Sequence, residues 1–182
     1  TKYIEIKGHS LQSVATDPIV YAGAWSSGGN LNTARNRAAG VGSVPAGLAF
    51  GGTTGSVSAL NESYNGTSWT EVGDLNTARL GLGGAGTTTA AIGFGGGTPS
   101  TTAINESWNG SSWTEVGDLN QSREKLAGAG ISTAALAIAG YNPSYSALNE
   151  SWDGSSWTEL ADINDAREKL AALYGVEVPE LM

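Results

Sequence analysis

The chain has 182 residues, a net charge of −8, 27 glycines and only 14% charged residues. A chain with this much glycine and this few charged residues can form few amphipathic helices, so its composition favours a β protein. With no cysteine and one histidine, His9, we expect no disulfide framework, metal site or cofactor, and the acidic charge argues against nucleic acid and anionic membranes as partners.

Residues 1–19 come first and differ from the rest of the chain. Residues 2–7 (KYIEIK) alternate in polarity, which is typical of a strand. Neither a signal peptide nor an apolar stretch of bilayer length is recognised, so we expect no membrane insertion. We interpret residues 1–19 as a segment for attachment or closure, 20–166 as a repeat region and 167–182 as a degenerate closing tail.

A block of nineteen residues recurs every 44 residues, at positions 61–79, 105–123 and 149–167. The first two copies, NESYNGTSWTEVGDLNTAR and NESWNGSSWTEVGDLNQSR, agree at 15 of 19 positions. A half-copy, WSSGGNLNTAR, covers residues 25–35. A period in this range indicates one supersecondary unit that is stacked several times.

Each unit is predicted to hold four short strands. In the second unit these are residues 79–86, 89–96, 102–108 and 112–119. Asn109-Gly110 favours a tight hairpin between the last two strands. The second strand is apolar throughout, as expected for burial on both faces, whereas the fourth alternates as expected nearer an edge. Four antiparallel strands in roughly 44 residues predict an all-β fold built from β-propeller blades.

The two ends of the chain leave the number of blades open. Three full blades fit the repeats, and a fourth, closing blade could be built from residues 2–7 and 20–25 with the tail 170–178. Such pairing would hide both sheet edges. The alternative is that several chains complete one ring. Residues 165–174 (DAREKLAALY), followed by Gly175, can be interpreted equally as a capped helix or as a strand.

The repeats resemble those of the kelch family. Gly96, which ends a second strand, is followed by Trp108 and then by Trp113, and a glycine, an aromatic residue and a tryptophan in this order are similar to a kelch repeat. The third unit departs with Ala139-Gly140 in place of Gly-Gly, and the spacing between aromatics is shorter than in kelch repeats. More specifically, the sequence NESWNGSSWTEVGDLN resembles the kelch-like repeats of tailed marine phage virions. This resemblance implies a kelch-like β-propeller associated with a phage tail or fibre.

The repeated side chains are interpreted as structural. Acids that recur in every blade do not form the asymmetric pair that acid–base catalysis needs, so we expect no catalytic residue. Arginines after each turn are expected to hydrogen-bond turn carbonyls or to pair with a neighbouring Asp, and a ring of ligand-binding arginines is the alternative. Tryptophans are expected to pack between blades. These anchors are Trp25, Trp69, Trp113, Trp157, Arg35, Arg79, Arg123 and Arg167.

The loop between the second and third strands differs from blade to blade. It reads TTGSV at 53–57, GTPST at 97–101 and YNPSY at 141–145. The last brings Tyr141, Asn142 and Tyr145 to a turn, a composition suited to stacking on a sugar and hydrogen-bonding to it. The alternative is that the tyrosines only cover the core. We take these three residues as the candidate binding site.

The sequence therefore favours a non-enzymatic virion protein, a propeller that attaches to a host glycan or receptor or docks on other virion proteins, and that forms a homo-oligomer. A cellular kelch-type domain that binds protein or carbohydrate, located in the cytoplasm, is the second hypothesis. A propeller glycosidase is the third, disfavoured by the single histidine and the symmetry of the acids.

Overall fold

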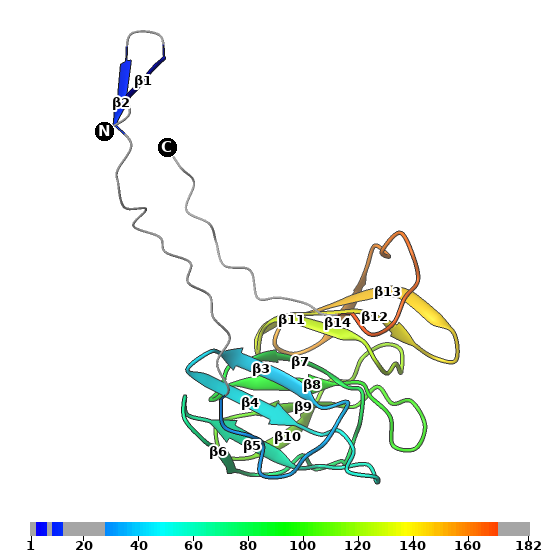
Figure 1. Ribbon diagram of the computed structural model, residues 1–182. Coiled ribbons are helices and arrows are strands. Elements are labelled where there is room, and N and C mark those ends of the chain that lie inside the picture. Colours follow the sequence, from blue (N-terminus) through cyan, green and yellow to red (C-terminus); the bar gives the residue numbers. More distant parts are fainter. Residues whose placement is uncertain (1–2, 7–8, 13–27, 171–182) are drawn as a thin grey trace.

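A computed structural model describes residues 3–6, 9–12 and 28–170. Within them the chain is all β, with three four-stranded antiparallel sheets (Figure 1). The first sheet contains β3 (Ala39–Ser43), β4 (Ala46–Phe50), β5 (Asn61–Tyr64) and β6 (Trp69–Glu71). The second contains β7 (Gly83–Gly86), β8 (Ala91–Phe94), β9 (Asn105–Trp108) and β10 (Trp113–Val116). The third contains β11 (Ala127–Ile131), β12 (Ala134–Tyr141), β13 (Tyr145–Trp152) and β14 (Trp157–Leu160). The prediction of four antiparallel strands in each repeat is confirmed.

In each sheet the strands pair in chain order, so that the first strand of the repeat lies at one edge and the fourth at the other. The hairpin between the last two strands closes at the predicted dipeptides. In the second sheet Trp113 pairs with Trp108 across this turn, and Gly110 has a φ of 97°. The Asn109 side chain accepts hydrogen bonds from the backbone N–H groups of Ser111 and Ser112, at 2.9 and 3.0 Å. The local sequence thus sets the register of the hairpin.

The hydrophobic core lies between sheets. One cluster joins the first and second sheets and contains Ala39, Leu48, Phe50, Leu75, Leu82, Ala91, Trp108 and Trp113. The equivalent cluster joins the second and third sheets and contains Ala85, Ile92, Phe94, Leu119, Leu126, Ala135, Ala137, Trp152 and Trp157. All four residues of β8 are buried because the second sheet is covered on both faces. This agrees with the apolar second strand in the sequence.

The first strands of the three sheets lie side by side, with β7 between β3 and β11 (Figure 1). Glycine makes the approach of β7 and β11 possible, because a Cβ atom on Gly128 would lie 2.3 Å from the carbonyl oxygen of Gly84. Backbone hydrogen bonds link the segments that precede these strands. The N–H of Gly81 donates to the Arg37 oxygen at 2.8 Å, and that of Lys125 donates to the Gly81 oxygen at 2.6 Å. The three sheets therefore form one stack.

A closing blade from the two ends of the chain is one of the two arrangements that the sequence allows. β1 (Tyr3–Ile6) pairs with β2 (His9–Gln12) as a separate two-stranded sheet. Residues 20–25 and 171–178, which the closing blade would need, lie outside the described residues. The described part of the helix-or-strand segment, residues 165–170, is not helical, and Arg167 forms a single bridge to Ser146.

Candidate functional site

The three loops that join second and third strands lie on the same rim of the stack. Each is tied by an antiparallel bridge to the segment that enters the first strand: Thr53 to Asn36, Gly97 to Leu80 and Tyr141 to Glu124. In the third sheet β12 and β13 are longer than their equivalents, and the last pair before the turn is Tyr141 with Tyr145. The structure therefore places the one aromatic loop at the tip of an extended hairpin.

The two tyrosines are positioned differently. The Tyr145 side chain is exposed, with 61% of its surface accessible, whereas Tyr141 is half-buried. Their ring centroids lie 6.2 Å apart in an edge-on arrangement. The Lys125 Nζ atom lies 4.6 Å from the centroid of the Tyr141 ring, which is within the range of a cation–π contact. Tyr145 is thus the accessible part of an aromatic pair with a cation beside it.

Asn142 holds this loop in place. Its Nδ2 group donates to the backbone oxygen of Ser122 at 2.6 Å and lies 3.0 Å from the Ser122 hydroxyl. Its Oδ1 atom accepts from the Thr101 hydroxyl at 3.1 Å. These contacts tie the hairpin of the third sheet to the second sheet and use both ends of the amide. Asn142 therefore fixes the hairpin to the second sheet, and its role in ligand binding stays a prediction.

Charged residues lie beside Tyr141 at the tip of the hairpin. Lys125 Nζ lies 3.1 Å from a carboxylate oxygen of Glu124 and 3.2 Å from one of Glu168. The hydrogen bond to Glu124 is the main cause that raises the pKa of Lys125. Hydrogen bonds from Lys169, above all, and from Lys125 lower the pKa of Glu168. The cation beside the Tyr141 ring therefore stays charged and is held in place by carboxylates.

Sequence reasoning did not include Lys125, Glu124, Glu168 or Ser122 in the candidate site. A signal was present, because the third unit and the tail read REK where the second unit reads RLG after the repeated arginine. In the tail, these residues fall in segment 165–174, for which the sequence predicts a helix or a strand. Their position beside the loop 141–145 depends on pairing between distant parts of the chain.

The repeated arginines are buried in the connections between sheets. The Arg79 guanidinium donates to the backbone oxygens of Gly95 at 2.8 Å and Ile104 at 2.7 Å, and pairs with Glu106 at 2.9 Å. Burial lowers the pKa of Arg79, while the Glu106 charge opposes that shift. Arg35 and Arg123 pair in the same way with Glu62 and Glu150. The acidic partner of these three arginines is thus a glutamate of the third strand, in place of an aspartate of the neighbouring blade.

Arg167 differs from the other repeated arginines, because its side chain is 49% exposed and pairs with Asp165.

The burial of the repeated tryptophans also differs from sheet to sheet. Trp113 and Trp157 are buried, Trp69 is half-buried, and Trp25 lies outside the described residues. Glu71, Glu115 and Glu159 are exposed, and Glu62, Glu106 and Glu150 are taken up by the buried arginines.

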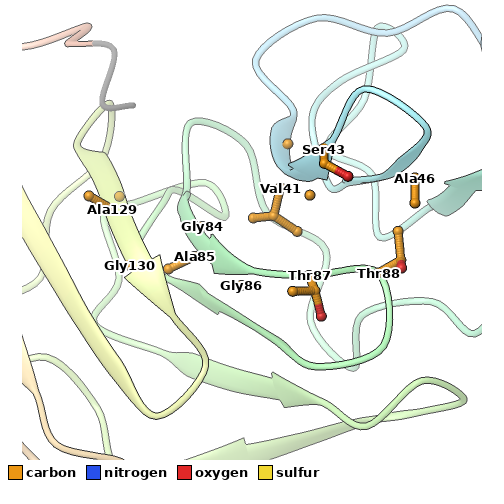
Figure 2. Close-up of a pocket in the computed structure, with 13 residues that line it drawn as sticks. Val41, Ser43, Ala46, Gly84, Ala85, Gly86, Thr87, Thr88, Ala129 and Gly130 are labelled. Atoms are coloured by element: carbon orange, nitrogen blue, oxygen red, sulfur yellow. The ribbon is translucent and has the colours of Figure 1, made fainter. Parts of the chain in front are cut away.

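A hollow of about 430 Å³ opens between the first strands of the three sheets (Figure 2). Its lining is made of small residues, among them Val41, Gly84, Ala85, Thr87 and Ala129. No acidic, basic or histidine side chain belongs to this lining. Among the described residues no cluster of histidine, cysteine, aspartate and glutamate could hold a metal ion. None of the described elements is a helix of the length and apolarity needed to cross a membrane. The polar side chains in the lining of the hollow are the hydroxyl groups of Ser43, Thr87 and Thr88.

Comparison with models of known protein families and with curated proteins finds no match for this chain.

Proposed function

We propose that this chain is a non-enzymatic recognition module of a phage virion, in which the three sheets are kelch-like β-propeller blades. The proposed contact is the hairpin tip with Tyr145 and Tyr141, supported by Lys125. The ligand class that this surface fits best is a host surface glycan, because an exposed aromatic ring stacks on a sugar face and the neighbouring charges bind hydroxyl groups.

The observation that carries this proposal is the contrast between the repeated and the unique side chains. Three of the recurring arginines are each paired with a buried glutamate of the third strand, as Arg79 is with Glu106. The aromatic hairpin occurs in one blade, is fixed by Asn142 to the neighbouring sheet and exposes Tyr145. A surface that is rigid, exposed and unique in the repeat costs little conformational entropy when it binds. The virion assignment is supported by the resemblance of the repeats alone.

A glycan array with the purified chain tests the proposed ligand class. Glycans that bind the chain should lose about 1–3 kcal/mol of binding free energy with the Tyr141→Ala, Tyr145→Ala double variant, the usual range for truncated aromatic anchors. Ser56→Ala, in the equivalent loop of the first sheet, should bind like the parent and serves as the control. Mass spectrometry of purified phage particles tests the virion assignment separately.

Two results would count against the proposal. Equal glycan binding by the double variant and the parent would remove the hairpin from the contact. Hydrolysis of a bound glycan by the purified chain would make it an enzyme.

A further inference from the structure

The third sheet exposes a face that is buried on the other two sheets. Each sheet has a front face, turned toward the following sheet, and a back face, turned toward the preceding one. Leu48 and Ile92 on the front faces of the first two sheets are 1% and 0% exposed, whereas the equivalent Leu136 is 39% exposed. Leu160 is 43% exposed, although its equivalents Val72 and Val116 pack against the two clusters.

The described residues cover the back face of the first sheet less completely than those of the other two sheets, although Trp69 Nε1 donates to the Gly29 oxygen at 3.0 Å. Its Trp69 is half-buried, while the equivalents Trp113 and Trp157 are 5% and 6% exposed. The surroundings of the first strands, β3 and β11, differ more clearly. A Cβ atom on Gly40 would meet only the Leu48 oxygen at 3.9 Å, whereas a Cβ atom on the equivalent Gly128 would lie 2.3 Å from the Gly84 oxygen. Among the described residues, no strand lies beside β3 in the place that β7 takes beside β11.

The two junctions inside the chain show what fits each of these faces. Phe50 on the front of the first sheet contacts Trp113 on the back of the second, with ring centroids 4.8 Å apart. Phe94 contacts Trp157 in the same way at 4.9 Å. On the front of the third sheet, the residue equivalent to Phe94 is Ile138. On the back of the first sheet, the residue equivalent to Trp113 is Trp69. These two residues belong to the two outer sheets of the described stack and share no core cluster.

The polar contacts of the junction repeat in the same way. Asn76, between the first and second sheets, donates its N–H to Glu106 at 2.7 Å and its Nδ2 group to the Trp113 oxygen at 2.9 Å. Asn164 and Arg167 occupy the equivalent places after the third sheet, where Asn164 is exposed and the Arg167 side chain is 49% exposed. The third sheet thus carries the donors as well as the apolar side chains of a junction.

We propose that a second copy of this chain docks head to tail, with the front face of the third sheet of one copy against the back face of the first sheet of the other. Ile138 and Leu136 then pack on Trp69, and Arg167 pairs with Glu62. Two copies contribute six sheets, a number within the range of roughly four to eight blades in closed propellers. Both open faces are used at two copies, so the assembly closes and does not grow into a filament.

Docking requires the exchange of one short segment. Asn32 already donates to Glu62 at 2.7 Å, and Arg35 pairs with Glu62 at 3.0 Å. Residues 163–167 (INDAR) of the incoming copy match residues 31–35 (LNTAR) and supply the same donors. Residues 163–167 of the incoming copy replace residues 31–35, so the polar contacts to Glu62 are conserved. Docking also buries the two apolar faces, which stabilises the assembly. These faces are distinct from the rim of Tyr145, and the inference does not rest on the proposed function.

Analytical ultracentrifugation of the full chain over a range of concentrations tests this assembly. The parent should form a dimer of twice the chain mass. Gly40→Leu blocks the back face and Leu136→Glu charges the front face, and each should raise the dissociation constant about tenfold or more. Both positions are open in one copy, so circular dichroism should show an unchanged fold. Val44→Glu, at an apolar position that is 93% exposed on the β3–β4 turn, is the control and should dimerise like the parent.

Cross-linking checks the orientation, because the chain has no cysteine of its own. A short bismaleimide should link a chain with Ile138→Cys to a second chain with Trp69→Cys, and should link neither variant efficiently to itself. A parent that remains monomeric overturns the proposal. A dimer that tolerates both Gly40→Leu and Leu136→Glu also overturns it, since association would then use another surface.

Discussion

Phe50 of the first sheet lies against Trp113 of the second, with ring centroids 4.8 Å apart. Trp113 also lies 5.4 Å from Trp108 of its own sheet. A tryptophan at the start of the fourth strand therefore joins two sheets. Because the equivalent pair Phe94 and Trp157 repeats this contact, the stack is held together by one aromatic junction used twice.

Replacement of Trp113 by alanine should lower the free energy of unfolding by about 3–5 kcal/mol, because it leaves a cavity between two sheets. Thr114→Ala, on the next and exposed position of the same strand, should change it by less than about 0.5 kcal/mol. Urea titration followed by circular dichroism measures both. A loss below about 1 kcal/mol for Trp113→Ala would contradict the junction.

The buried pair of Arg79 and Glu106 provides a second prediction. Both side chains are 0% exposed, so Glu106→Gln leaves a buried guanidinium without its counter-charge and should cost about 3–5 kcal/mol. Glu115 lies directly opposite Glu106 in the sheet but is exposed. Glu115→Gln is therefore a matched control with little expected effect, and equal midpoints for the two variants in urea would argue against the role of the ion pair.

Two equivalent glycines should respond differently to a methyl group. Gly128→Ala places a Cβ atom against the backbone of Gly84, so we expect a loss of about 1–3 kcal/mol from overpacking. Gly40→Ala meets open space and should be nearly neutral in the monomer. Thermal unfolding at low protein concentration compares them. Similar melting temperatures would show that β7 and β11 are not in close contact.

Asp153 should make one hairpin sensitive to acid. Its carboxylate accepts hydrogen bonds from the backbone N–H groups of Ser156 and Ser155, which lower its pKa to about 2. Because this pKa lies below the value of about 3.9 in an unfolded chain, the stabilisation is present above pH 4 and is lost as the pH falls toward 2. NMR titration of the carboxyl carbon measures the pKa directly.

Asp153→Asn should remove that acid dependence while keeping the turn, because asparagine occupies the equivalent positions 65 and 109. An ordinary pKa for Asp153 near 4, or an unchanged acid profile in the asparagine variant, would contradict the prediction.

Local pattern was enough to predict the strands and their hairpins. The dipeptides such as Asn109-Gly110 and the apolar second strand act through neighbours within a few residues. The period of 44 residues shows that the same local pattern recurs along the chain. The four-stranded antiparallel repeat follows from them. The sequence also pointed to Tyr141 and Tyr145, because the loop between the second and third strands differs from repeat to repeat and is aromatic at 141–145.

The tertiary structure decided which equivalent residues have equivalent surroundings. Asn142 becomes a clamp because Ser122 and Thr101 come within hydrogen-bond distance from the second sheet. Lys125 reaches Tyr141 because the segment before β11 pairs with the end of β12. Arg79 and Arg167 share one place in the repeat, but only Arg79 has a sheet packed over it. The environment of a repeated side chain depends on what lies against its sheet, and the repeat by itself contains no information on that.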